Sequence, residues 1–158
     1  MLDTIVAFSD SHNNPLPQRF IDIANENEYV FFLGDGLARL GDIVLHKGFH
    51  GIKGNCDSVA FPKEEVICVG GINVLLTHGD AYGVKSDLLR LAMRAKELNC
   101  TVVFYGHTHF ASIDEYDGIT LVCPGALSQS VYGEATYVYA TVYNRKFTAK
   151  IVKLSQIC

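Results

Sequence analysis

The sequence predicts an α/β fold built from mixed β-sheets. Across the first two thirds of the chain, short apolar runs alternate with segments whose apolar residues recur at helical spacing, a pattern typical of α/β layering. From Ser112 onward the pattern changes to strands separated by tight turns. A front part rich in helices and a back part rich in strands indicate mixed sheets rather than a wholly parallel one.

Length and composition favour one domain spanning residues 1–158. The 158 residues are 49% hydrophobic and 19% charged, which is enough for one sizeable core and too apolar for disorder. The formal net charge is −4 and no Lys/Arg block is present, which argues against an extended nucleic-acid surface. A small phosphate ester stays compatible with this charge, because metal ions could supply the local attraction.

Three features predict a cytoplasmic protein without membrane segments. No apolar run approaches the roughly 18 residues that a membrane helix requires. The first residues show neither the basic region nor the long apolar stretch of a signal peptide. The five cysteines are scattered and odd in number, so reduced thiols are the simpler interpretation.

In the first half of the chain, strands are expected at short apolar runs bounded by turn residues. Phe20, Ile21 and Ala24 recur at helical spacing after two prolines, which is typical of a helix and its start. We therefore predict strands at 4–9, 29–33 and 51–53, with helices at 16–27 and 37–46.

The second half begins with a hairpin and ends in a series of strands. Gly70-Gly71 separates two apolar runs by two residues, a strong hairpin signal. Ser86 can cap a helix that runs to about Leu98. Turns are expected at Asp117-Gly118 and Asn144-Arg145. We predict strands at 64–69, 72–77, 102–105, 113–116, 119–123, 136–143 and 147–154.

Five of the predicted strands lead into residue types that bind metal ions. In open α/β sheets, ligands bind at the carboxyl edge of the strands. The mixed set of carboxylate, imidazole and amide suits Mn²⁺, Fe²⁺, Zn²⁺ or Ni²⁺ rather than an all-oxygen Ca²⁺ site. Each motif alone is weak, whereas all five in order at strand ends are a strong signal. The motifs are Ser9-Asp10-Ser11-His12, Gly34-Asp35-Gly36, Gly54-Asn55-Cys56-Asp57, Thr77-His78-Gly79-Asp80 and Gly106-His107-Thr108-His109.

The ordered motifs resemble those of the calcineurin-like metallophosphoesterases. The short length and the Gly54-Asn55-Cys56-Asp57 form are similar to the small prokaryotic phosphodiesterases of the YfcE type. Cys123-Pro124-Gly125-Ala126 resembles the Pro-Gly-Ser turn of that family, so the resemblance covers most of the chain. It implies a metallophosphoesterase-type sandwich of two mixed β-sheets flanked by helices, with two divalent metal ions between the sheet edges.

The resemblance also implies a ligand set and the cofactor. We expect two Mn²⁺ ions, with Ni²⁺, Zn²⁺, Fe²⁺ and Mg²⁺ as alternatives. The sequence departs from the family at Asn13, Asp80 and Ala126, which leaves the proposed ligands in place and the substrate class more open. Carried over by position, Asp10, His12 and His109 hold the first metal, Asn55, His78 and His107 hold the second, and Asp35 bridges both; Asp35, Asn55, Cys56, Asp57 and His78 form the catalytic set.

The implied reaction is hydrolysis of a phosphodiester, in a small or nucleotide-like substrate, by a hydroxide that bridges the metals. Two divalent cations outweigh the charges of Asp10 and Asp35, so the site attracts an anion although the chain is acidic. Cys56 stands where many relatives with monoesterase activity carry a histidine that protonates the leaving group. We therefore expect weak protonation, or protonation by Asp57 or water, and a preference for diesters with good leaving groups.

Two alternatives to a phosphodiesterase remain. The first is an enzyme that hydrolyses phosphomonoesters or nucleoside polyphosphates. The second is a non-catalytic scaffold, because a eukaryotic trafficking-complex subunit resembles this fold while its metal site has degenerated. The scaffold alternative predicts missing ligands, whereas His12 and the other proposed ligands are all competent side chains.

Several charged residues have a functional and an ordinary interpretation. Arg19 and Arg39 follow ligand strands and are either phosphate contacts or, as we expect, helix-surface charges. His46 and His50 have the spacing of a helical metal pair, but Gly48 lies between them. We expect a loop or solvent-facing role for both histidines.

The strand at Thr136–Tyr143 has small apolar residues on one face and tyrosines on the other. It is either covered on both faces within the domain or carries a tyrosine-bearing interface for a homo-oligomer. Cys68, Cys100 and Cys123 are expected to be small buried apolar residues, and Cys158 to be incidental.

Overall fold

The computed structural model describes residues 1–128 and 133–157; Cys158 lies outside the described residues. Its strands form two five-stranded sheets. Sheet A has the order β10-β9-β1-β2-β3, with β1 (Leu2–Phe8), β2 (Tyr29–Phe32), β3 (Phe49–Gly51), β9 (Thr136–Tyr143) and β10 (Lys146–Lys153). Sheet B has the order β4-β5-β6-β8-β7, with β4 (Glu64–Val69), β5 (Ile72–Thr77), β6 (Val102–Phe104), β7 (Ser112–Tyr116) and β8 (Ile119–Cys123).

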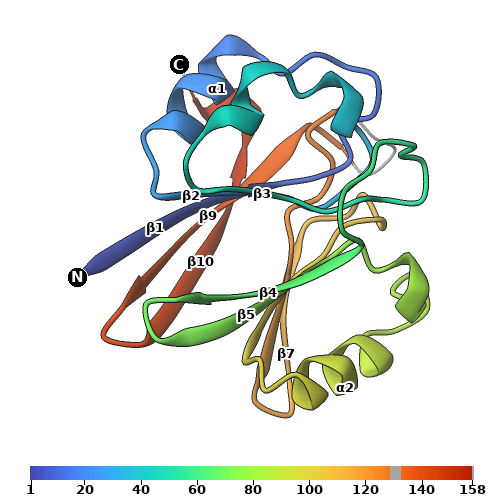
Figure 1. The fold of residues 1–158 in the computed structure, drawn as a ribbon, viewed down its shortest axis with the longest axis vertical. Helices are drawn as coiled ribbons and strands as arrows, with labels where there is room; N and C mark the ends of the chain where they lie inside the picture. Colours follow the sequence, from blue (N-terminus) through green and yellow to red (C-terminus); the bar gives the residue numbers. More distant parts are fainter. Residues whose placement is uncertain (129–132, 158) are drawn as a thin grey trace.

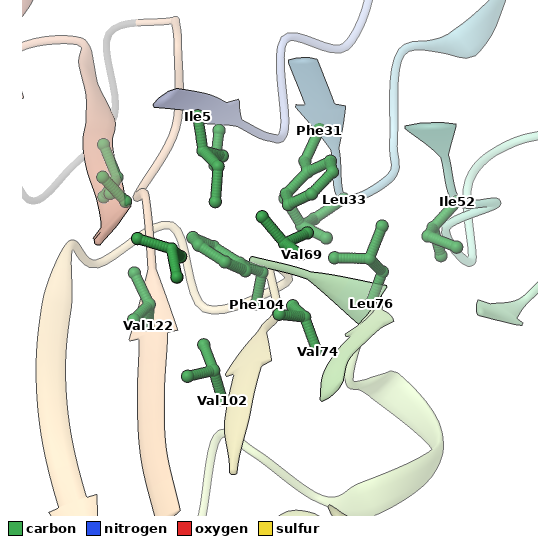
Figure 2. Close-up of a cluster of buried hydrophobic side chains, with 14 residues drawn as sticks. Ile5, Phe31, Leu33, Ile52, Val69, Val74, Leu76, Val102, Phe104 and Val122 are labelled. Atoms are coloured by element: carbon green, nitrogen blue, oxygen red, sulfur yellow. The ribbon is translucent and has the colours of Figure 1, made fainter. Parts of the chain in front are cut away.

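The two sheets face each other across the main hydrophobic core, and one helix covers the outer face of each (Figure 1). Ile5 and Phe31 from sheet A point toward Val74 and Phe104 from sheet B (Figure 2). Helix α1 (Gln18–Asn25) packs on the outer side of sheet A, and α2 (Leu89–Glu97) on the outer side of sheet B. This confirms the predicted sandwich of two mixed sheets flanked by helices.

Each sheet contains three parallel strands, and this arrangement gathers the loops that carry the ligand motifs. Strands β1, β2 and β3 are parallel in sheet A, as are β5, β6 and β8 in sheet B. Parallel strands end at the same edge of their sheet, so the residues that follow them meet there. The antiparallel strands β4, β7, β9 and β10 complete the sheets.

The predicted hairpin turns are confirmed. Gly70 and Gly71 both have positive φ, at 56° and 86°, and join β4 to β5. Asp117-Gly118 and Asn144-Arg145 also have positive φ at both residues, as a two-residue turn between twisted antiparallel strands requires.

The helix predicted over 37–46 is wrong as a single element. Two short 3₁₀ helices stand there instead, η1 (Leu37–Arg39) and η2 (Gly41–Leu45). Gly41 has a φ of 72°, a left-handed conformation that an α-helix cannot continue through. Leu37, Leu40 and Ile43 have helical spacing and are buried together, but their spacing does not reveal the break at Gly41.

The predicted Ser86 cap is also wrong. Residues before α2 form η3 (Asp80–Tyr82) and a turn at Gly83, whose φ is 63°. The helix starts later, at Leu89, whose backbone N–H donates to the Asp87 side chain at 3.0 Å. This bond satisfies one of the free amides at the helix start.

Strand β9 lies inside sheet A between β1 and β10, so both of its edges are paired. Val138, Ala140 and Val142 are buried between the sheets. Tyr137 is buried on the other face, with its ring centroid 5.2 Å from that of Phe20 in α1. The strand is therefore covered on both faces over much of its length, the first of the two interpretations given above.

The cysteine predictions hold for Cys100 and Cys123, which are buried, and fail for Cys68, which is exposed. Cys68 pairs with Asn73 on the outer face of the edge strand β4, outside the cluster that packs under α2. In the described part of the chain, no helix is long and apolar enough to cross a membrane.

Candidate metal centre

Backbone hydrogen bonds join the loops that follow the parallel strands. The Asp10 N–H donates to the Gly34 carbonyl at 2.9 Å, and the His12 N–H donates to the Asp35 carbonyl at 2.8 Å. In sheet B, the Gly106 N–H donates to the His78 carbonyl at 3.0 Å. These bonds hold each pair of neighbouring loops in a fixed register.

Five of the seven proposed ligands adopt a backbone conformation that non-glycine residues rarely take. The φ values lie between 50° and 76°, in the left-handed region. Such a conformation costs about 1–2 kcal/mol per residue. It lets each chain turn sharply as its strand ends, so that the side chain points toward the space between the sheet edges. The five residues are Asp10, His12, Asp35, His107 and His109.

The first cluster is formed by Asp10, His12 and His109, as the sequence placed them. Their donor atoms lie within 4.8 Å of one another. His109 Nε2 lies 3.2 Å from Asp10 Oδ1 and 3.3 Å from His12 Nε2. These residues follow β1 and β6, one strand from each sheet. The cluster therefore bridges the two sheets.

The Asp10 carboxylate has one satisfied oxygen and one without a hydrogen-bond donor. Oδ2 accepts the Ser9 hydroxyl at 2.6 Å and the His107 backbone N–H at 3.1 Å. Oδ1 is buried and has no hydrogen-bond partner in the described part of the chain. A buried charged oxygen without a donor is costly unless a cation binds it. Two imidazole nitrogens face this oxygen, so the donor set fits a divalent metal ion.

The second cluster contains Asp35, His78 and His107. His78 Nε2 lies 3.3 Å from Asp35 Oδ2 and 3.2 Å from His107 Nδ1. On the other side of the ring, His78 Nδ1–H donates to the Leu33 carbonyl at 2.6 Å. That bond leaves Nε2 as the nitrogen with a lone pair in the neutral ring, which is the arrangement that metal-binding histidines use.

Asp35 and His12 connect the two clusters, because both belong to a third group with Cys56. Asp35 Oδ1 accepts the Cys56 backbone N–H at 2.8 Å. Gly54 permits this contact, since a Cβ atom there would lie 2.2 Å from Asp35 Oδ1. Asp35 is therefore grouped with ligands of both clusters, and its role as the bridging ligand stays a prediction.

Asn55 is exposed, and its amide Nδ2 lies 3.7 Å from Cys56 Sγ. Its neighbours Gly54 and Cys56 both contact Asp35, so Asn55 lies beside the clusters. Its role as a metal ligand stays a prediction.

Asp57 has a structural role that the sequence did not reveal. Its Oδ2 accepts the backbone N–H groups of Asp35 at 2.7 Å and Gly54 at 2.9 Å. Its Oδ1 accepts those of Gly36 at 2.8 Å and Leu37 at 3.1 Å. Both carboxylate oxygens are thus directed at backbone amides, which disfavours the proton-donor role suggested for Asp57. A carboxylate two residues after Asn55 was the only signal available, and turns commonly carry one.

The charges within the clusters shift the pKa values of their members. Burial raises the pKa of Asp35, but hydrogen bonds from His78 and the Cys56 amide outweigh it and bring the pKa to about 2. Burial lowers the pKa of His78, and Asp35 and Asp10 raise it by more. Burial, together with His78, lowers the pKa of His107. Asp35 is therefore a permanent anion beside imidazoles of differing basicity.

Cys56 is exposed, and its pKa is raised by desolvation and by the neighbouring Asp35. Its thiol is therefore neutral near pH 7. Asp80, whose role the sequence left open, begins η3 directly after the His78-Gly79 turn and is exposed. It lies close enough to raise the pKa of His107.

The remaining candidates fall in different places. Arg39 lines a hollow together with His12 and Asp35, whereas Arg19 is exposed on α1. His46 Nε2 lies 2.8 Å from the Asn27 carbonyl, and His50 Nδ1 lies 2.9 Å from Glu65 Oε2. Both histidines are half-buried. His46 lies in the loop between η2 and β3, which confirms the loop role expected for it, whereas His50 lies within β3, so the expectation is wrong for His50.

Known proteins similar to this chain include probable metallophosphoesterases and Vacuolar Protein Sorting 29. The chain is 29% identical over 154 residues to the probable metallophosphoesterase YsnB of Bacillus subtilis, covering 92% of this chain and 88% of YsnB. A predicted phosphoesterase from Streptococcus pneumoniae superposes with a TM-score of 0.82 at 24% identity, covering 97% of this chain and 90% of that one.

Two more solved structures share the fold. The zinc complex of Vps29 from Entamoeba histolytica has a TM-score of 0.73 at 22% identity, covering 97% of this chain and 99% of that one. An archaeal phosphodiesterase has a TM-score of 0.68 at 18% identity, covering 94% and 99%. The family model of the calcineurin-like phosphoesterase superfamily domain matches residues 4–145. With that match, the two-sheet fold and the ligand motifs at its strand ends, the chain belongs to the calcineurin-like phosphoesterase superfamily.

Proposed function

We propose that this chain is a hydrolase that cleaves phosphodiester bonds in small or nucleotide-like substrates, with two divalent cations at the clusters around Asp10 and Asp35. One observation carries the proposal. Three groups of potential metal ligands, drawn from His, Asp and Cys side chains and linked by His12 and Asp35, converge at the carboxyl edges of both sheets. When bound, two such ions supply hydroxide at neutral pH and neutralise the phosphoryl oxygens.

The chain's own residues hold and orient this chemistry. Asp10 and Asp35 bring the negative charge that retains the cations, and the Leu33 carbonyl fixes the ring of His78. Asn55 as a neutral ligand would leave the site more positive than a third carboxylate would, which favours an anionic substrate. We propose Mn²⁺ as the native ion because the mixed oxygen and nitrogen donors suit it.

A preference for diesters is the finer part of the proposal. Cys56 lies beside Asp35 with a neutral thiol, and a thiol is a poor proton donor compared with an imidazolium. Both oxygens of Asp57 accept hydrogen bonds from backbone amides, four in total. Neither residue readily protonates a poor leaving group, so esters with good leaving groups are favoured. The archaeal structural neighbour that is named a phosphodiesterase supports this choice.

The test is add-back of single metals to metal-stripped protein. Mn²⁺, Ni²⁺, Zn²⁺ or Mg²⁺ is supplied with bis(p-nitrophenyl) phosphate and, separately, with p-nitrophenyl phosphate. We expect the diester to be hydrolysed with at least one metal, and faster than the monoester. Faster monoester hydrolysis supports the phosphomonoesterase alternative. Absence of turnover with every metal overturns the enzyme proposal.

The Vps29 neighbours keep a scaffold function as the second candidate, because they share the fold at TM-scores above 0.7. The two candidates differ in how they respond when the proposed metal site is impaired. Asp35→Asn removes the proposed bridging ligand, so a hydrolase should lose its biological activity, whereas a scaffold should keep it. We further propose a cytoplasmic location.

The homo-oligomer interface on the outer tyrosine face of β9 stays a prediction. Measuring the mass of the protein in solution tests it.

A further inference from the structure

Two hollows of different size and chemistry adjoin the metal ligands. The larger, which we call the His107 pocket, has a volume of about 600 Å³ and includes His107 and His109. The smaller, which we call the Cys56 pocket, has a volume of about 220 Å³ and includes His12, Asp35 and Cys56. The first lies on the side of sheet B and the second on the side of sheet A, because their ligands follow β6 and β1–β3 respectively.

The two pockets match the two organic arms of a phosphodiester. A phosphomonoester has one arm and would use a single pocket. Pockets that bind small molecules usually measure about 300–1,000 Å³. The His107 pocket falls within that range, and the Cys56 pocket falls below it. The larger arm of the substrate therefore belongs in the His107 pocket and the smaller arm in the Cys56 pocket.

Apolar and aromatic side chains form part of the wall of the His107 pocket, beside polar and charged ones. Val84 and Tyr105 are buried at its base, and Leu88 and Phe110 contribute the remaining apolar surface. Phe110 is 54% exposed although it is a large apolar residue. Its backbone N–H donates to Thr108 Oγ1 at 3.2 Å, which holds the loop backbone at this point. A flat aromatic group fits against such a side chain.

Polar groups lie at the rim of the same pocket. Lys85 is exposed and forms no ion pair with any described acidic side chain. It lines the same pocket as His107 and His109. Ser112 and Asp114 provide hydrogen-bonding groups. A pocket that combines aromatic and apolar side chains with a lysine and hydrogen-bonding groups suits a nucleoside attached to a phosphate.

We propose that the His107 pocket binds the nucleoside arm of a phosphodiester substrate, with Phe110 stacking on the base, while the Cys56 pocket receives a small second arm. This inference rests on the proposed phosphodiesterase function and names its substrate class. Phe110 is then a specificity-determining residue, and Lys85 draws the phosphate toward the clusters.

The experiment compares two chromogenic diesters that share a leaving group. Thymidine 5′-(p-nitrophenyl phosphate) has a nucleoside arm, and methyl p-nitrophenyl phosphate does not. Base stacking on an aromatic ring predicts at least a tenfold higher kcat/KM for the thymidine ester, equivalent to about 1.4 kcal/mol. Phe110→Ala should remove about tenfold from the thymidine ester and change the methyl ester by less than twofold. Phe110→Leu keeps an apolar side chain and should recover only part of the loss.

Tyr116→Ala is the matched control, because Tyr116 is an exposed aromatic at the far end of β7. It should leave both esters unchanged. Equal kcat/KM for the two esters in the wild type, or equal losses for both in Phe110→Ala, overturns the inference while leaving the hydrolase proposal standing.

A second measurement does not depend on turnover. Saturation-transfer NMR with thymidine and metal-stripped protein should show transfer to the base protons in the wild type, and much less in Phe110→Ala. Transfer without hydrolysis of any diester supports the pocket assignment and overturns the proposed function. Absence of transfer in the wild type overturns the pocket assignment.

Discussion

Asp57 Oδ2 accepts the backbone N–H of Asp35 at 2.7 Å, and the same oxygen accepts the N–H of Gly54 at 2.9 Å. One carboxylate thus joins the loop after β2 to the loop after β3. These are the loops that carry the proposed bridging ligand and Asn55. The position of Asp35 between the two clusters therefore depends on a residue whose own carboxylate is occupied by backbone amides.

Asp57→Asn should weaken both the fold and metal binding. An amide replaces one acceptor oxygen with an NH₂ group, which cannot accept the two backbone N–H groups that this oxygen satisfies. We expect the free energy of unfolding to fall by about 1–3 kcal/mol, and metal affinity to fall by about tenfold because the bridging residue is displaced. Urea unfolding and metal titration measure the two effects. Asp42→Asn, an exposed acidic residue in η2, is the control and should change neither. Unchanged metal affinity in Asp57→Asn would show that Asp57 does not position Asp35.

Asp35→Asn should abolish turnover and leave the protein folded. Asparagine keeps an oxygen that can accept the Cys56 N–H, but it loses the charge that holds the cations together. We expect kcat to fall by about a hundredfold or more while the circular dichroism spectrum stays the same. Diester hydrolysis at saturating Mn²⁺ measures the loss. Near-wild-type turnover would rule out Asp35 as the bridging ligand.

Cys56→His should shift the preference of the enzyme toward monoesters. A histidine at this position could carry the proton that a neutral thiol does not release to a poor leaving group. We expect the ratio of monoester to diester kcat/KM to rise about tenfold, measured with the two p-nitrophenyl esters and their alkyl counterparts. Cys56→Ser keeps a small neutral group and should leave the ratio within about twofold. An unchanged ratio in Cys56→His means that position 56 is remote from the leaving group.

Glu64 should make the stability of the protein depend on pH. Burial raises the pKa of Glu64, but hydrogen bonds from Arg94 and Tyr82 outweigh it, so the pKa lies below the ordinary value of 4.5. A carboxyl whose pKa is lowered by folding stabilises the protein above the unfolded pKa, and the effect is lost as the pH falls through the folded pKa.

The test of this pH dependence is urea unfolding of wild type and Glu64→Gln at pH 7 and at pH 4. We expect the wild type to be more stable by about 1 kcal/mol at pH 7, the size of a partly exposed ion pair, and the difference to shrink at pH 4. Glu115→Gln, on the exposed part of β7, should behave like the wild type at both values. A difference that stays constant with pH would contradict the ion-pair explanation.

The sequence was sufficient to predict the elements whose signal is local. The strand pattern, the Gly70-Gly71 hairpin and the ligand motifs at strand ends follow from apolar periodicity and turn residues. The break at Gly41 was missed because the apolar spacing around it continues across the glycine. The role of Asp57 was missed for a different reason, since three of its four donors lie 20 to 22 residues earlier, in the loop after β2, and only the fourth, Gly54, is near in sequence. No local pattern reports contacts of that range.

The left-handed backbone at Asp10, His12, Asp35, His107 and His109 has a consequence for how this lineage can change. Glycine adopts this backbone conformation without strain. Replacing a ligand by glycine therefore removes a metal donor and at the same time gains about 1 kcal/mol of folding stability at each position, which offsets part of the stability lost with the side chain. Selection on folding alone therefore does not protect the metal site.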